Sequence, residues 1–338
     1  WMLAGKSINQ PLRTSMLYNN ADFNCSKFRG VGSWSVQNSG GGTTNPETPL
    51  QGLVRSHNTT QASMAQQIKL CSIADAARIL GYHNSPLGQE SVYSANSLNP
   101  PMTIGSVQAS PLTVANVYAT IGADGVACDP IAIKRVVDKN GKRLKVPSAH
   151  CHQAIPKGIA QTAAYALNQG VVQPGGEAST TQLDGGRKTF AKTGTNEQYY
   201  MTTAGFVPYQ VASFVAVGNA ESQKSFNGMT INGRTMAAWY GMYIATPAWK
   251  QFMNDYLKAA NIPVDNDYGK PDPKYTAGGT LPGTPKNTVK TDQQKRDEDA
   301  RKQAAQEQQE EAKTQKNTQD QYGTARRDDY GDSETDNY

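Results

Sequence analysis

Residues 187–195 read Arg187-Lys188-Thr189-Phe190-Ala191-Lys192-Thr193-Gly194-Thr195, and the prediction of the fold starts from them. The stretch is rich in β-favouring residues and ends in a lysine, a glycine and two hydroxyls. A turn-like trio at 196–198 and a second β-favouring run at 199–207 follow it, a pattern typical of two antiparallel strands joined by a tight turn. The stretch therefore predicts one edge of an antiparallel sheet.

The end of this strand favours binding of a carboxylate. Lys192 supplies a positive charge, and the hydroxyls of Thr193 and Thr195, two residues apart, face the same side of a strand. Gly194 has no side chain, so another molecule can lie flat against the backbone there. The sequence predicts a docking edge for a peptide that ends in a carboxylate. A solvated turn is the alternative that the letters K-T-G-T alone leave open.

Charge and composition divide the chain into two parts. Of its 33 basic and 28 acidic residues, 21 and 12 lie in residues 1–262, which leaves 12 and 16 in residues 263–338. The first part is basic, which suits a cell wall or membrane surface, and it has no basic-aromatic stripe that would favour nucleic acid. Past residue 282 aliphatic side chains almost disappear. We predict a globular domain over 1–262 and a disordered polar tail over 263–338.

The four cysteines favour an oxidising compartment over a metal site, with four buried thiols as the alternative. They form no C-x-x-C pair, and their number is even. Four cysteines can form two disulfides in three ways. We predict the pairing that joins Cys25 to Cys71 and Cys128 to Cys151. His150-Cys151-His152 is interpreted as a loop, because adjacent residues cannot easily share one ion. No metal and no cofactor are expected.

A second motif, Ser56-His57-Asn58, lies at a junction between predicted helices. Ser-x-Asn occurs five times in the chain, but only here does it lie between strongly helical segments. A side chain at such a junction can point into a cleft. A polar helix cap is the alternative reading of Ser56.

Further helices are predicted at 103–124, 156–172 and 236–259, and strands at 201–207 and 211–217. Helices that flank a meander of strands indicate a mixed α/β fold of the α+β type. The last helix supplies candidate core side chains: Trp239, Ile244, Trp249, Phe252 and Leu257.

Taken in order, these pieces resemble the C-terminal part of the transpeptidase domain of class A penicillin-binding proteins, of the actinobacterial type. The resemblance covers about residues 1–257. It implies a β-lactamase/transpeptidase-like fold with an antiparallel sheet flanked by helices. The segments that carry it are Thr48–Asn58, Gly105–Leu112, 119–122, Lys192–Thr195, Ala204–Pro208 and Thr246–Lys250.

The family's nucleophile motif, S-x-x-K, is missing from all 338 residues. We expect it, with a glycosyltransferase domain and a membrane anchor, upstream of Trp1 in a longer parent, so that the domain is truncated at its N-terminus and this fragment alone is inactive. The resemblance implies an extracytoplasmic peptidoglycan D,D-transpeptidase that crosslinks stem peptides through a serine acyl-enzyme. Its partners would be a stem peptide ending in D-Ala-D-Ala, β-lactam antibiotics and the division or elongation machinery, with no nucleic acid.

The resemblance also assigns roles to individual residues. Ser56, Asn58 and Lys192 would be catalytic: Ser56 relays a proton, Asn58 binds the substrate amide, and Lys192 orients Ser56. The segment Thr193-Gly194-Thr195 would bind the substrate, with hydroxyls on its carboxylate and the backbone N–H of Thr195 in the oxyanion hole. A D,D-carboxypeptidase or β-lactamase-like hydrolase, and a non-catalytic wall-binding scaffold, are the alternatives.

Overall fold

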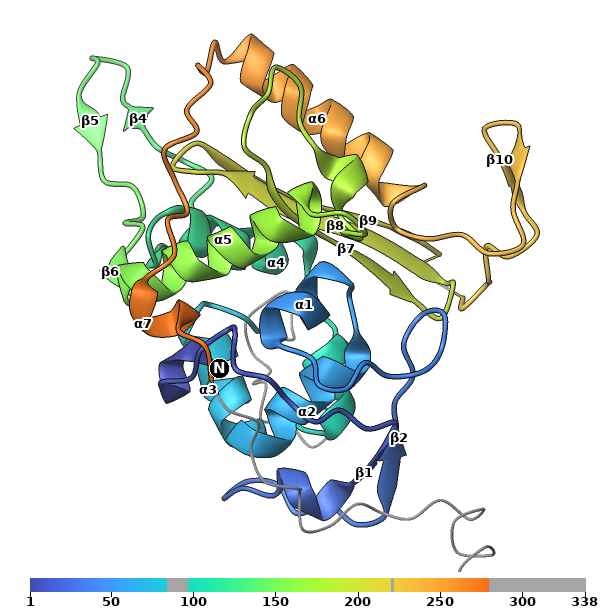
Figure 1. Cartoon of the computed structure of the whole chain (residues 1–338). Coiled ribbons are helices and arrows are strands. Elements are labelled where there is room, and N and C mark those ends of the chain that lie inside the picture. Colours follow the sequence, from blue (N-terminus) through green and yellow to red (C-terminus); the bar gives the residue numbers. More distant parts are fainter. Residues whose placement is uncertain (84–96, 220–221, 280–338) are drawn as a thin grey trace, which may run out of the picture. The chain divides into compact units, whose positions relative to one another are not determined.

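A computed structural model of the chain describes residues 1–83, 97–219 and 222–279 (Figure 1). Its central element is a three-stranded antiparallel sheet in the order β7-β8-β9, formed by β7 (Phe190–Asn196), β8 (Tyr200–Val207) and β9 (Val211–Gly218). Lys192 pairs with Ala204 across β7 and β8. The predicted strand–turn–strand unit is confirmed. In its turn, Glu197 and Gln198 take left-handed backbone angles, with φ of 49° and 61°.

Helices cover both faces of this sheet, as Figure 1 shows. Phe190 and Phe206 point toward α4 (Pro111–Gly122) and α5 (Lys157–Val172), and their rings stack with centroids 4.9 Å apart. Ala191 lies on the other face, in one buried cluster with side chains of α6 (Ala245–Ala259). The alternation follows from the two-residue period of a strand. The predicted antiparallel sheet flanked by helices is confirmed.

A second, mainly helical region precedes the sheet in the sequence. It contains α1 (Pro49–Val54), α2 (Asn58–Ile68) and α3 (Leu70–Ile79), together with the hairpin of β1 (Leu17–Asn19) and β2 (Ser33–Ser35). The remaining short elements are η1 (Met2–Ala4), η2 (Asn20–Phe23), η3 (Pro100–Ile104), β3 (Val126–Ala127), β4 (Val136–Val137), β5 (Arg143–Leu144), β6 (His152–Gln153), η4 (Ser179–Thr181), β10 (Thr230–Ile231), β11 (Arg234–Thr235) and α7 (Pro273–Thr276).

Two disulfides link the cysteines as the sequence analysis predicted. Cys25 pairs with Cys71, which joins the loop after η2 to α3. Cys128 pairs with Cys151, and the two residues adjoin the paired strands β3 and β6. Each bond closes a loop in the unfolded chain, so each reduces the entropy that the chain gains on unfolding.

The predicted boundary of the polar tail at residue 262 is too early. Residues 263–279 pack against the domain: Tyr268 and Tyr275 are buried, and Arg187 donates hydrogen bonds to the backbone oxygens of Ile262 and Pro263. Single aromatic side chains anchor this segment, so its polar composition hid its order. Residues 280–338 of the predicted tail lie outside the described residues.

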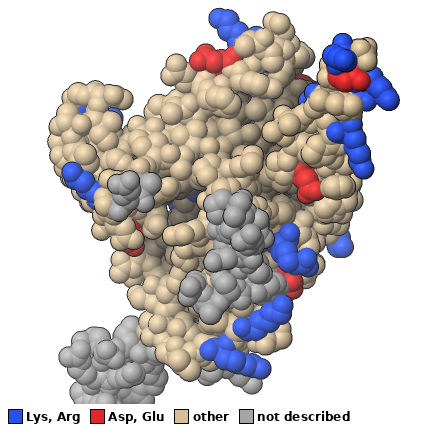
Figure 2. Space-filling model, turned by 180° about the vertical axis from the view of Figure 1, so that it is seen from behind, with Lys and Arg blue, Asp and Glu red and all other residues tan. Residues whose placement is uncertain are grey.

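The surface of the described part carries its charges unevenly. On the face seen in Figure 2, Lys and Arg side chains recur along one edge, with few Asp and Glu between them, in keeping with the basic composition of residues 1–262. Within the described ranges, none of the helices combines the length and the apolar character that crossing a membrane requires.

Candidate active site

Ser56 and Lys192, 136 positions apart in the sequence, meet in the structure. The Nζ of Lys192 donates a hydrogen bond of 2.7 Å to the Oγ of Ser56 and a second of 2.6 Å to the backbone oxygen of Thr193. Ser56 follows α1 and Lys192 lies on β7, so the helical region and the sheet both contribute to one site. A hydroxyl hydrogen-bonded to an ammonium is arranged to pass a proton.

The local sequence explains why Ser56 points out of the helices. Thr48 and Gln51 form a capping box at the start of α1, and the helix ends at Arg55. Ser56 then takes a left-handed φ of 56°, and α2 begins at Asn58 with His57 as its N-cap residue. The reading of Ser56 as a polar helix cap is therefore wrong. A left-handed serine costs about 1–2 kcal/mol, so its neighbours must hold it in place.

Asn58 lies at the first position of α2, two residues after Ser56. Its amide nitrogen donates to the backbone oxygen of Gln37 at 2.8 Å, which fixes the orientation of the side chain. Because that bond uses the nitrogen, the side-chain oxygen remains the group suited to accept an N–H from a bound amide.

The two threonines of the K-T-G-T stretch differ in their hydrogen bonds. Thr193 is buried and donates its hydroxyl proton to the backbone oxygen of Glu177 at 3.3 Å. Thr195 is exposed, and its oxygen accepts the backbone N–H of Gly241 at 3.0 Å, so its own proton remains to be donated. Thr195 is thus better prepared than Thr193 to donate to a carboxylate.

A glycine at position 194 leaves the backbone accessible to another molecule, and it is also required because its neighbours pack closely against it. A Cβ at this position would collide with the hydroxyl of Thr202 on β8. Gly241 packs equally closely, since a Cβ there would meet the backbone oxygens of Gly194 and Thr202. Sequence reasoning missed Gly241, because its only signal, a glycine, is common in this chain.

Within the described part of the chain, no strand pairs with the outer edge of β7. β7 pairs with β8 on one side and ends the sheet on the other. An edge strand presents unpaired backbone N–H and C=O groups, to which an extended peptide can add as a further strand. The predicted docking edge is thus an edge strand.

Lys192 has an unusual protonation equilibrium. Burial lowers its pKa to about 8, and the nearby charge of Glu177 opposes this shift. At neutral pH the side chain is mainly charged and donates to Ser56, but it gives up its proton far more readily than an exposed lysine. Such a group is suited to general acid–base chemistry.

The lowered pKa predicts a pH-dependent difference in stability between the wild-type chain and a Lys192→Met variant. Below pH 8 the folded and unfolded chains are both protonated at Lys192, and the cost of the buried charge is fully present. Between pH 8 and 10.5 the folded chain releases the proton first, so stability rises with pH. Wild type should gain about 3 kcal/mol relative to the variant between pH 7 and 11, measured by denaturant unfolding. A constant difference across this range would contradict the assignment.

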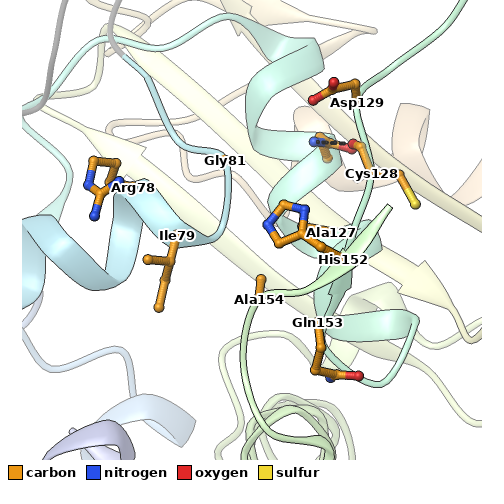
Figure 3. Close-up of a pocket in the computed structure, with 10 residues that line it drawn as sticks. Arg78, Ile79, Gly81, Ala127, Cys128, Asp129, His152, Gln153 and Ala154 are labelled. Carbon is orange, nitrogen blue, oxygen red and sulfur yellow. Dashed lines mark hydrogen bonds between the residues drawn. The ribbon is translucent and has the colours of Figure 1, made fainter. Parts of the chain in front are cut away.

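A separate hollow of about 340 Å³ lies between the end of α3 and the paired strands β3 and β6 (Figure 3). Arg78, Asn116, Asp129 and His152 supply polar groups to its wall. The amide of Asn116 already donates to the backbone oxygen of Cys128. None of the predicted site residues lines this hollow, so we place the candidate active site at Ser56 and Lys192.

Comparison with known proteins agrees with this arrangement. Residues 11–254 match the model of the penicillin binding protein transpeptidase domain. Penicillin-binding protein 1A of Mycobacterium tuberculosis is 29% identical over 229 residues, which are 63% of this chain and 26% of that protein. Penicillin-binding protein 1A of Aquifex aeolicus is 30% identical over 153 residues, 45% of this chain and 19% of that protein. The chain thus spans about a fifth to a quarter of the length of these relatives.

Solved structures share the fold. The structure of PonA1 from Mycobacterium tuberculosis in complex with penicillin V aligns with a TM-score of 0.67 and 22% identity, over 84% of this chain and 72% of that one. Penicillin binding protein 3 from the same organism, complexed with ampicillin, aligns with a TM-score of 0.54 and 19% identity, over 79% and 60%. The predicted β-lactamase/transpeptidase-like fold is confirmed.

The family model covers well over half of the chain, and the names of the relatives agree with the class A type predicted from the ordered motifs. The chain therefore belongs to the family of penicillin-binding protein transpeptidase domains.

Proposed function

We propose that this chain is the part of a peptidoglycan D,D-transpeptidase that supplies the S-x-N and K-T-G-T motifs of the active site. The hydrogen bond between Lys192 and Ser56 carries the proposal, because it joins the two motifs in one site. In this family the nucleophilic serine belongs to the S-x-x-K motif, which these 338 residues do not contain. The substrate lies in the cell wall, and the two disulfides suit that extracytoplasmic location.

The chemistry is acyl transfer in two steps. The nucleophilic serine attacks the penultimate D-Ala carbonyl, its proton passes through Ser56 to the leaving nitrogen, and the terminal D-Ala departs. The amine of a second stem peptide then attacks the ester and releases the serine. Asn58 accepts the substrate amide N–H, Thr195 donates to the terminal carboxylate, and the extended substrate lies along the edge of β7. β-Lactams, which mimic the D-Ala-D-Ala amide, would acylate the same serine.

Labelling by fluorescent penicillin tests this proposal. The parent protein with its S-x-x-K segment should form a covalent adduct, and Ser56→Ala should slow adduct formation about 10²- to 10³-fold, because proton relay is lost. Stopped-flow labelling and intact mass measure both. If the folded parent protein forms no adduct, the catalytic proposal is wrong, and the non-catalytic wall-binding scaffold is the function that remains.

Product analysis separates the two kinds of enzyme. Crosslinked stem-peptide dimers are expected from the labelled parent. Release of free D-Ala without dimers would instead indicate a carboxypeptidase, and turnover of penicillin a β-lactamase-like hydrolase.

A further inference from the structure

Glu47 is a carboxylate without any exposed surface, and it lies close to the S-x-N motif in the structure. Three side chains donate to it. The Nδ1 of His57 is 2.9 Å from one carboxylate oxygen and 3.0 Å from the other, Arg55 donates to the first oxygen at 3.4 Å, and the Thr60 hydroxyl donates to the second. These donors come from the end of α1, the junction and α2, so one carboxylate joins both helices.

The backbone fixes this carboxylate in position. The N–H of Glu47 donates to the backbone oxygen of Leu12 at 3.0 Å, and the N–H of Leu12 donates to that of Glu47 at 2.8 Å. Leu12 is itself fully buried, and Thr48, the next residue, caps α1. The backbone of Glu47 is therefore held by Leu12 and by the start of α1, which fixes the position from which its side chain extends.

Arg55 and His57, which both reach Glu47, are the residues on either side of Ser56. Within the described residues, Ser56 itself forms no hydrogen bond with Glu47. Its backbone takes a left-handed φ of 56°, a conformation that a serine adopts only under constraint. With both neighbours attached to one fixed group, the junction can present Ser56 to Lys192 at 2.7 Å.

We propose that Glu47 is a positioning residue for the candidate active site: its buried carboxylate holds Arg55 and His57 and thereby keeps the Ser56 hydroxyl against Lys192. The role of this position in catalysis rests on the proposed function, whereas its effect on the geometry of Ser56 does not.

A buried charge is a demanding way to join two helices. A carboxylate removed from water costs several kcal/mol unless donors surround it, and an apolar cluster of similar volume is often equally stabilising. An apolar cluster lacks direction, however, while three charged or polar donors fix both the distance and the orientation of the residues that carry them. A residue that sets the position of Ser56 has to make directional contacts of this kind.

The first test uses the chain itself and needs no catalysis. Glu47→Gln keeps the shape of the side chain, but its amide can no longer accept at both atoms. NMR should show that the Cα and Cβ chemical shifts of Ser56 leave the range of left-handed residues. Titration of a ¹³C-labelled Lys192 should give a pKa that differs from that of the wild-type chain. This pKa should be the same in Glu47→Gln, in Ser56→Ala and in the double variant. Asp22→Asn is the matched control, since Asp22 also accepts from α2, through Gln66 at 2.8 Å, but away from Ser56.

Unchanged Ser56 shifts and an unchanged Lys192 titration in a folded Glu47→Gln chain would overturn the proposal. If that variant does not fold, Arg55→Met replaces it. The Arg55 side chain is 47% exposed, so this change removes one of the three donors without opening the core. It should displace the same signals in the same direction by a smaller amount.

The second test measures acylation in the parent protein. Glu47→Gln should slow penicillin acylation about 10- to 100-fold, as expected for a misplaced reacting group, and should have no further effect in a Ser56→Ala background. Equal fractional losses in both backgrounds would mean that Glu47 acts on stability alone. If the wild-type parent takes no label, the proposed function fails, and the NMR test still decides the positioning role.

Discussion

Replacing Lys192 with Met in a parent protein that carries the S-x-x-K segment should reduce the rate of acylation by penicillin about 10³-fold. The change removes the donor that lies 2.7 Å from Ser56, and the positive charge at the point where a substrate carboxylate would dock. Loss of a proton-transfer partner costs about 10²–10⁴ in rate, and loss of a stabilising charge has a similar effect. Because Lys192 does both, its loss should exceed that of Ser56→Ala.

Lys188→Met is the control for this experiment. Lys188 precedes β7 by two residues, and its ammonium donates to the backbone oxygen of Tyr268 in the core region, apart from Ser56. Stopped-flow labelling of both variants, after thermal unfolding has shown that each is folded, separates the site from general effects of losing a lysine. Equal rates in the two variants would remove Lys192 from the mechanism.

The sheet was predictable because it depends on local signals. Along 190–207 successive side chains alternate between the two faces of the sheet, so Phe190 and Ala191 are buried on opposite faces. This alternation is a property of the strand itself and does not depend on contacts with distant segments. The sequence left three pairings of the four cysteines open, and the observed one joins consecutive cysteines that are 46 and 23 residues apart.

Contacts between distant segments were not predictable. The pattern in 236–259 predicts one helix, but α6 begins only at Ala245. Before it, the N–H of Trp239 donates to the side chain of Gln198 and the N–H of Gly241 to Thr195, and these bonds draw the segment over the end of β7. Tertiary hydrogen bonds thus override a helical pattern.

The candidate site shows the same division. The resemblance to class A penicillin-binding proteins implied that Ser56 and Lys192 belong to one groove, and the structure brings them together. No sequence pattern indicated that Thr193 would donate to the backbone oxygen of Glu177, or that Glu47 would be buried beside His57. Both depend on where a backbone oxygen or a side chain from another element arrives, and no periodicity describes that.

Trp249→Ala should lower the free energy of unfolding by about 3–5 kcal/mol, the largest stability effect expected from one side chain in this domain. Trp249 is fully buried on α6, and its Nε1 donates to the backbone oxygen of Ser213 on β9 at 3.2 Å. Its ring also lies against Gly205 on β8, where a Cβ would be only 2.5 Å away. Removing it leaves a cavity and an unpaired carbonyl beneath the sheet.

Phe252 provides the control: its predicted place in the core is wrong, since it lies on the same helix with 49% of its surface exposed. Phe252→Ala should cost less than about 1 kcal/mol, because little buried surface is lost. Denaturant unfolding of the oxidised chain measures both variants, and similar losses would mean that α6 does not pack through Trp249. Gly205 pairs with Ala191, next to Lys192, so the cavity lies under the strand that carries Lys192. Trp249→Ala in the parent should therefore slow acylation as well, whereas Phe252→Ala should not.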